Sequence, residues 1–182
     1  MIPNLTPTEY ARRGQKAYQA GDYLSAAQAF AAAKSAYLSQ GDNLLAAEMA
    51  NNQSVALLKA GQAEAALQAV EDTPEQFAAA GDPRRQAMAL GNCAAALEAL
   101  GDPHSAIKFY EQSADLLAAL GENDLRATVL QALAQVQLRC GKPLEAVTKL
   151  QEGMQIHSGS GIKHRLIRYL SRLPFRLLNK SL

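Results

Sequence analysis

The chain of 182 residues has no tryptophan, and aromatic residues make up only 5% of it. A core with so few large rings must be packed closely from small side chains, and alanine, which occurs 36 times, supplies them. Because alanine is the strongest helix former and is depleted from strands, this composition excludes an all-β fold. No apolar run approaches the roughly 18 residues that a membrane span needs. The start of the chain lacks the basic and apolar regions of a signal peptide.

The chain also has few cysteines and almost no net charge. The formal net charge of +1 excludes a uniformly basic nucleic-acid-binding chain. The two cysteines, Cys93 and Cys140, are far apart and form no ligand cluster, which predicts a reduced, cytoplasmic protein. Hydrophobic residues make up 48% of the chain and charged residues 19%, enough apolar material for a folded core. The length suits one compact domain or a short repeat array.

Glycine is regularly spaced, and the spacing predicts the architecture. Eight of the twelve glycines recur at every twentieth position, at Gly21, Gly41, Gly61, Gly81, Gly101, Gly121, Gly141 and Gly161. Glycine can take the left-handed conformation that closes a helix, an Asp after it can cap the next helix, and proline suits the first helical position. Each block between glycines therefore predicts one helix of about 16–18 residues, antiparallel to its neighbours. The segment Thr6–Glu9 is a capping box that starts the first helix.

The blocks between glycines alternate in pattern, so the true repeat is two blocks and two helices long. Every second block carries a recurring alanine near its start, at Ala26, Ala66, Ala106 and Ala146. A larger residue follows one helical turn later, at Phe30, Val70, Tyr110 and Leu150. We expect the alanines to let the two helices of a pair approach closely and the larger residues to fill the gap between pairs.

The segment from Ala89 to Leu116 resembles a tetratricopeptide repeat. It matches that family at Ala94, Leu97, Gly101, Ala106 and Tyr110. The first repeat matches at Tyr10, Gly14, Gly21, Tyr23, Ala26, Phe30 and Ala33, and the second and fourth have Ser54 and Ala134 at the small position. The 40-residue spacing is similar to the longer-helix subclass of the family. The resemblance implies an all-α, right-handed superhelical solenoid of four helix pairs plus a C-terminal capping helix.

On this reading the array occupies residues 1–161, with repeats at about 7–40, 41–80, 81–120 and 121–158, and a basic amphipathic helix occupies 162–182.

Two places break the pattern. Thr73-Pro74-Glu75-Gln76 puts proline inside an expected helix but also matches a helix start, so we predict a break near 71–73 and a short helix over 74–80. The alternative interpretation is a local kink without functional meaning. The second break is a joint at 158–161.

No catalytic or metal-binding constellation is found in the sequence. The nucleotide-binding motifs GxxxxGK[ST] and GxGxxG are absent, and the cysteines have no partner at metal spacing. His104 follows a turn, His157 falls where the other repeats place packing residues, and His164 has no partner for chemistry. The sequence therefore predicts a protein that is not an enzyme and that uses no cofactor or metal.

What the resemblance does imply is a concave groove lined by the first helix of each pair, where partner segments bind. The lining residues by register are Gln15, Tyr18, Glu48, Asn51, Asn52, Val55, Lys59, Asn92, Ala95, Glu98, Thr128, Gln131, Gln135, Leu138 and Arg139. Side-chain amides both donate and accept, so they can pair with the backbone of an extended ligand. Asn52 and Asn92, one full repeat apart, are expected to stack as a short ladder, although these residues could also form an ordinary polar exposed face.

A cationic clamp for a chaperone's terminal carboxylate, known in the family, is missing. The clamp register holds Ala11, Gln15, Asn52, Met88 and Asn92, none of which is cationic. A carboxylate would find no charge partner there, so this use is disfavoured. The predicted partner is therefore an unidentified protein or peptide in the groove, with self-association through the array ends as a further possibility.

The end of the chain differs in charge from the rest. Residues 162–182 carry six basic residues and no acidic one, which leaves 12 basic against 17 acidic residues in the repeats. Leu166, Leu170, Leu173 and Leu177 form an apolar stripe beside a stripe of arginines. We expect the leucines to cover the fourth helix pair around Leu133, Val147 and Leu150. The alternative is a peripheral adaptor that binds an anionic membrane surface or a nucleic acid through this helix.

Overall fold

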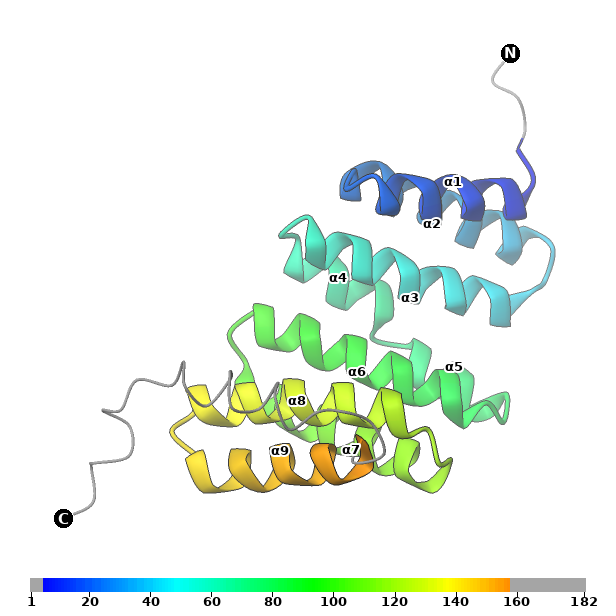
Figure 1. The fold of residues 1–182 in the computed structure, drawn as a ribbon. Helices are drawn as coiled ribbons and strands as arrows, with labels where there is room; N and C mark the ends of the chain where they lie inside the picture. The colour runs from blue at the N-terminus through cyan, green and yellow to red at the C-terminus, as the bar shows by residue number, and fades with distance from the viewer. Residues whose placement is uncertain (1–4, 158–182) are drawn as a thin grey trace.

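The computed structural model describes residues 5–157, and within this range it contains nine α-helices and no strand (Figure 1). The helices are α1 (Pro7–Gln19), α2 (Tyr23–Ser39), α3 (Asn43–Lys59), α4 (Ala63–Val70), α5 (Thr73–Ala79), α6 (Pro83–Ala99), α7 (Pro103–Ala119), α8 (Asn123–Arg139) and α9 (Pro143–His157). The second helices of the pairs begin at the same point of each repeat, at Tyr23, Ala63, Pro103 and Pro143. The joint at 158–161 and the basic segment 162–182 lie outside the described residues.

The glycine turns are confirmed by the backbone. All seven regularly spaced glycines up to Gly141 have φ between 69° and 83°, the left-handed region, whereas Gly161 lies beyond the described part. At Gly101 the amide donates to the carbonyl of Glu98 at 3.1 Å, and the amide of Asp102 donates to the carbonyl of Leu97 at 2.9 Å. The same pair of bonds closes every one of these turns, so each helix ends and the chain reverses in the same way.

The helix starts are confirmed as well. Four aspartates accept a hydrogen bond from the backbone amide three residues later, at 2.9–3.2 Å: Asp22, Asp42, Asp82 and Asp102. At the first helix Thr6 and Glu9 form the expected capping box. These bonds satisfy amides that the first turn of a helix leaves without a partner.

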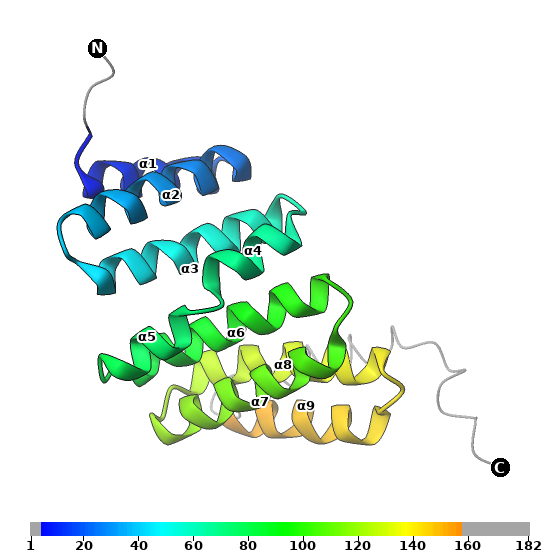
Figure 2. The ribbon, with the colours of Figure 1, turned by 180° about the vertical axis from the view of Figure 1, so that it is seen from behind.

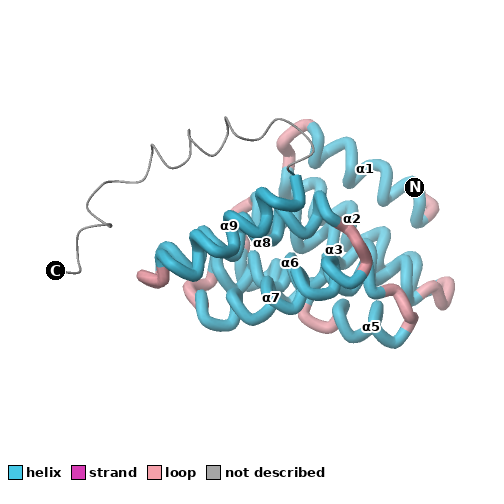
Figure 3. The backbone as a smooth tube through the Cα atoms, turned by 60° about the horizontal axis from the view of Figure 1, so that its bottom comes forward, coloured by secondary structure: helices cyan, strands magenta, loops and turns pink. Residues whose placement is uncertain are grey.

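The helices are arranged in two layers. Figure 1 shows α1, α3, α6 and α8 on one side of the stack, here called the first-helix side, and Figure 2 shows α2, α4, α5 and α7 on the opposite side. In the tube view of Figure 3 the loops gather at the helix ends. Because α2 packs on both α1 and α3, and α7 on both α6 and α8, the core continues along the array, as in a solenoid.

The recurring alanines are buried between helices, as predicted. All four, at Ala26, Ala66, Ala106 and Ala146, are 0% exposed. The larger residues one turn later, Phe30, Val70 and Tyr110, are also buried, whereas Leu150 in the last helix is half-buried. Small side chains at the crossing points therefore let the layers approach closely, and the aliphatic and aromatic residues fill the space between pairs.

The second helix of the second repeat breaks where the sequence predicts. Helix α4 ends at Val70 and α5 begins at Thr73. Pro74 has no amide hydrogen to give the carbonyl of Val70, and two side chains replace that donor. The Thr73 hydroxyl lies 2.8 Å from this carbonyl oxygen, and the Cys93 thiol of α6 donates to it at 3.6 Å.

The break changes how neighbouring repeats meet. Elsewhere an unbroken second helix packs between consecutive first helices, but here α3 and α6 also pack directly against each other. Helix α5 anchors this joint with Phe77, which is 0% exposed and packs with Ala47 of α3 and Ala89 of α6. The break therefore brings the middle two first helices of the array into contact.

Candidate functional site

The sequence-predicted groove residues all lie on α1, α3, α6 and α8 and so share the first-helix side (Figure 1). Five are exposed: Gln15, Lys59, Thr128, Gln131 and Arg139. Nine are half-buried: Tyr18, Glu48, Asn52, Val55, Asn92, Ala95, Glu98, Gln135 and Leu138. The exception is Asn51, which is only 9% exposed.

Asn51 belongs to the joint between α3, α5 and α6. Its Oδ1 accepts a hydrogen bond from Nδ2 of Asn92 at 3.4 Å and lies 3.2 Å from the Thr73 hydroxyl. The ladder that the spacing predicts between Asn52 and Asn92 is therefore wrong, because Asn92 pairs with the preceding residue of α3. Direct packing of α3 on α6 brings Asn51 within reach of Asn92. Because Asn51 is buried and already bonded, it is not available to a ligand as the predicted groove residues require.

The carboxylates of this surface are neutralised within the chain. Glu48 of α3 pairs with Arg85 of α6 at 3.0 Å. Glu98 of α6 pairs with Arg139 of α8 and accepts a hydrogen bond from the Tyr110 hydroxyl of α7 at 3.2 Å. These ion pairs tie consecutive first helices together, so the surface offers a ligand little net charge.

Sequence reasoning missed two partners of these carboxylates: Arg85 of α6 on the surface, and the hydroxyl of Tyr110, which is buried in α7. Burial and the nearby Glu98 carboxylate raise the pKa of Tyr110, so its hydroxyl stays protonated and remains a donor to Glu98. The only signal in the sequence was that Glu48 and Arg85, like Glu98 and Arg139, are opposite charges in consecutive first helices. Without the interhelical geometry such a signal does not identify partners.

At Met88, one position of the missing carboxylate clamp, the neighbouring cation is already paired. Met88, at 43% exposed, stands in the clamp register, and the Arg84 guanidinium lies beside it, 3.9 Å from Nη1 to Sδ. That guanidinium is bound to Glu122 of the α7–α8 turn at 2.6 Å. A terminal carboxylate would therefore have to displace Glu122 from Arg84.

The other groups that could react are Cys93 and His104, and neither has the surroundings of a catalytic residue. Cys93 is buried, and burial, with the charges of Glu75 and Glu71, raises the pKa of its thiol to about 12, so the nucleophilic thiolate is not available near neutral pH. His104 is exposed beside a turn.

Across residues 5–157 no group of His, Cys, Asp and Glu is arranged to hold a metal ion. In the same range no helix is both long and apolar enough to cross a bilayer.

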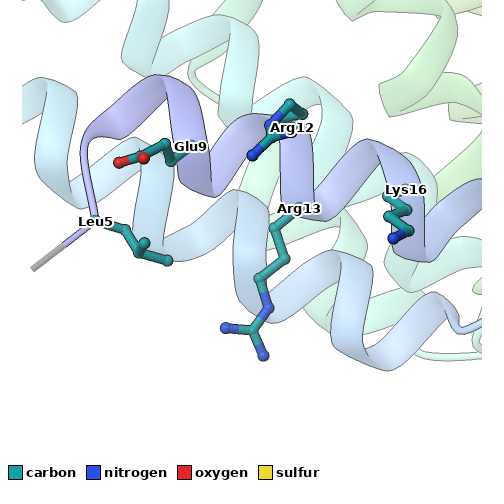
Figure 4. Close-up of a pocket in the computed structure, with 5 residues that line it drawn as sticks. All are labelled: Leu5, Glu9, Arg12, Arg13 and Lys16. Atoms are coloured by element: carbon teal, nitrogen blue, oxygen red, sulfur yellow. The ribbon is translucent and has the colours of Figure 1, made fainter. Parts of the chain in front are cut away.

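An open depression of about 270 Å³ lies outside the predicted groove set, along α1 (Figure 4). It is lined by Leu5, Glu9, Arg12, Arg13 and Lys16. Glu9 is already engaged by the Thr6 capping box. The depression therefore presents three basic side chains and one occupied carboxylate.

Comparisons with known proteins agree with this architecture. A family model described as "Tetratricopeptide repeat" matches residues 82–158. Two crystal structures from Podosopora anserina, of nearly identical TPR-like repeats in a protein assigned as a kinesin light chain, align with a TM-score of 0.70 at 17% identity. One alignment covers 84% of this chain and 75% of that one, and the other 85% and 76%. Among curated proteins, no sequence matches this chain significantly.

Proposed function

We propose that this chain, whose residues 82–158 match the tetratricopeptide repeat family, is a non-enzymatic binding module, since members of that family generally mediate protein–protein interactions. It holds an extended segment of a partner protein on its first-helix side. The observation that carries the proposal is a set of unpaired side-chain amides on that side. The side chains of Gln15, Asn52, Gln131 and Gln135 come from three helices and make no hydrogen bond within the described residues.

These amides suit a ligand backbone. Each offers a donor and an acceptor, which match the carbonyl and amide of an extended chain without requiring a particular sequence. The carboxylates Glu48 and Glu98 are held by arginines, so they neither attract a basic ligand strongly nor repel an acidic one. The half-buried Val55, Ala95 and Leu138 add apolar surface on the same helices α3, α6 and α8. Recognition by hydrogen bonds and small apolar contacts follows.

Selection of peptides on the full chain tests this proposal. A phage-displayed library of random short peptides is panned against the wild-type chain, and the recovered peptides are measured on variants. The double change Asn52→Ala with Gln135→Ala is expected to weaken their binding by about tenfold, since two hydrogen bonds at roughly 0.5–1.5 kcal/mol each are lost. Melting should stay almost unchanged, because neither side chain bonds to the rest of the fold.

The matched control is Gln68→Ala with Gln112→Ala, which removes two exposed amides from the second helices α4 and α7. It should leave peptide binding within about twofold of wild type. Equal losses in both double variants, or no loss in either, would refute binding on the first-helix side.

A second candidate function uses the basic segment 162–182, whose six positive charges without an acid favour contact with anionic membranes or nucleic acid. The salt dependence of binding distinguishes this function from peptide binding in the groove. Since Glu48, Glu98 and Arg139 are paired internally and Lys59 is the one predicted groove charge without a described ion pair, peptide affinity should change little between about 50 and 300 mM salt. Binding through six cations would fall steeply over the same range. We also propose a cytoplasmic location, because two distant cysteines that form no ligand cluster are typical of a reduced, cytoplasmic protein.

A further inference from the structure

The outer face of α1 is charged at positions where an inner repeat is apolar. Helix α6 buries Ala89, Cys93 and Ala96 at three positions of the repeat. In α1 the same three positions carry exposed charged residues, which are Glu9, Arg13 and Lys16. Figure 4 shows them together with Arg12 around the open depression along α1. Because these side chains are exposed and no other described helix lines the depression, this face is open to a partner.

The cations of this face are not neutralised by the fold. All six arginines of residues 5–157 lie on first helices. Four of them form ion pairs with carboxylates elsewhere in the array: Arg84–Glu122, Arg85–Glu48, Arg126–Glu152 and Arg139–Glu98. Within the same range Arg12, Arg13 and Lys16 have no carboxylate at ion-pair distance. The face therefore keeps three unpaired positive charges.

The chain has no acidic residue free to pair with these three cations from the elements around α1. Helix α2, against which α1 packs, contains no Asp or Glu. Asp22, in the turn between the two helices, caps the start of α2, and Glu9 is engaged in the capping box of α1. Residues 1–4 and 158–182 contain no Asp or Glu either. A carboxylate for this face therefore has to come from another molecule.

The rest of the array is acidic, which favours a small acidic ligand at α1 over a large polyanion. Residues 1–40 carry four basic and two acidic residues, whereas residues 41–161 carry eight basic and fifteen acidic ones. The field of this distribution directs an acidic segment to the first repeat. A nucleic acid or an anionic bilayer would extend beyond α1 and meet the acidic repeats. A short acidic segment of a protein needs only the three cations.

We infer that the outer face of α1 docks a short acidic segment of a partner protein, held by Arg12, Arg13 and Lys16. Arg12 and Lys16 are four residues apart, which is about 6 Å along a helix axis. Side chains on one side of an extended segment recur about every 6.6 Å, so two alternate carboxylates can reach both cations. Each arginine can hold a carboxylate through two parallel hydrogen bonds. This surface goes beyond the proposed groove, since none of the three cations belongs to the groove set.

The test titrates the full chain with a hexaglutamate peptide whose ends are blocked, and follows the backbone amide signals by nuclear magnetic resonance. At about 50 mM salt the shifted signals are expected in residues 5–20. The double change Arg13→Gln with Lys16→Gln should weaken binding about fivefold, because two exposed ion pairs are lost. Raising the salt to about 300 mM should weaken wild-type binding about threefold or more. Both side chains are exposed, so the melting midpoint should not change.

The matched control is Lys34→Gln with Lys108→Gln, which removes the same charge from the second helices α2 and α7. A further control, Arg168→Gln with Arg172→Gln, removes it from the basic segment 162–182. Both controls should bind hexaglutamate within about twofold of the wild type. The α1 variant leaves the four groove amides in place, so this result does not depend on whether library peptides bind the groove.

Any of four results would overturn the inference. The first is wild-type binding of hexaglutamate by Arg13→Gln with Lys16→Gln, or an equal loss in the lysine control. The second is amide shifts confined to residues 162–182, which would assign acidic ligands to that segment. The third is a concentration-dependent dimer in light scattering that the α1 variant dissociates, which would assign the face to a second copy. The fourth is sedimentation with phosphatidylcholine–phosphatidylserine vesicles that the α1 variant loses, in a chain that does not bind hexaglutamate, which would assign the face to a membrane.

Discussion

Replacing Phe77 by Ala is expected to lower the free energy of unfolding by about 3–5 kcal/mol, the usual cost of removing a buried aromatic ring. Phe77 is 0% exposed and lies between Ala47 of α3 and Ala89 of α6. Neither alanine can extend into the space that the ring would leave. Helix α5 has only seven residues, Thr73–Ala79, so it has few other contacts with which to hold the joint.

Urea denaturation of the full chain, followed by circular dichroism, measures this loss. Phe109→Ala in α7 is the control, because Phe109 is only half-buried and the same change there should cost clearly less. A loss below about 1 kcal/mol at Phe77 would show that the joint between α3 and α6 does not depend on the ring.

Ala106→Leu is expected to destabilise the chain by about 1–3 kcal/mol, because the larger side chain overpacks a closed contact. Ala106 is 0% exposed and packs in one cluster with Ala94 of α6 and Leu130 of α8. The three added carbon atoms would push α7 away from α6, and the repeat could not relax without moving its neighbours.

Ala118→Leu near the end of the same helix is the matched control. Ala118 is exposed, so the change should alter stability by less than about 0.5 kcal/mol. Comparing the two denaturation midpoints isolates burial from helix propensity. An unchanged midpoint in Ala106→Leu would mean that the recurring alanines are not the crossing points of the helix pairs.

The turns and helix starts could be predicted from the sequence because they depend on neighbours in the chain. The glycine with positive φ at Gly101 and the capping carboxylate at Asp102 each act on residues next to them in the chain. The same is true of the break at Thr73-Pro74, where the missing proline amide decides where α4 ends. The regular spacing of the glycines then extended these local signals to the whole array.

The candidate site was less predictable because it depends on how the repeats approach each other. Asn51 and Asn52 are adjacent and chemically identical, yet only Asn51 meets Asn92, and the packing of α3 on α6 decides this. The pairing of Glu48 with Arg85 likewise needs the distance between two helices, which a register alone does not give. Register placed these residues together on the first-helix side of the solenoid but not in their final contacts.

The most direct measurement of the central claim is site-specific photo-crosslinking. A benzophenone amino acid replaces Asn52 or Gln131 on the first-helix side, and Gln68 or Gln112 on the second-helix side, and each chain is irradiated with a peptide selected on the wild type. The proposed function predicts peptide adducts from positions 52 and 131 and none from 68 and 112. Adducts of equal yield from both sides, or from the second helices alone, would contradict it.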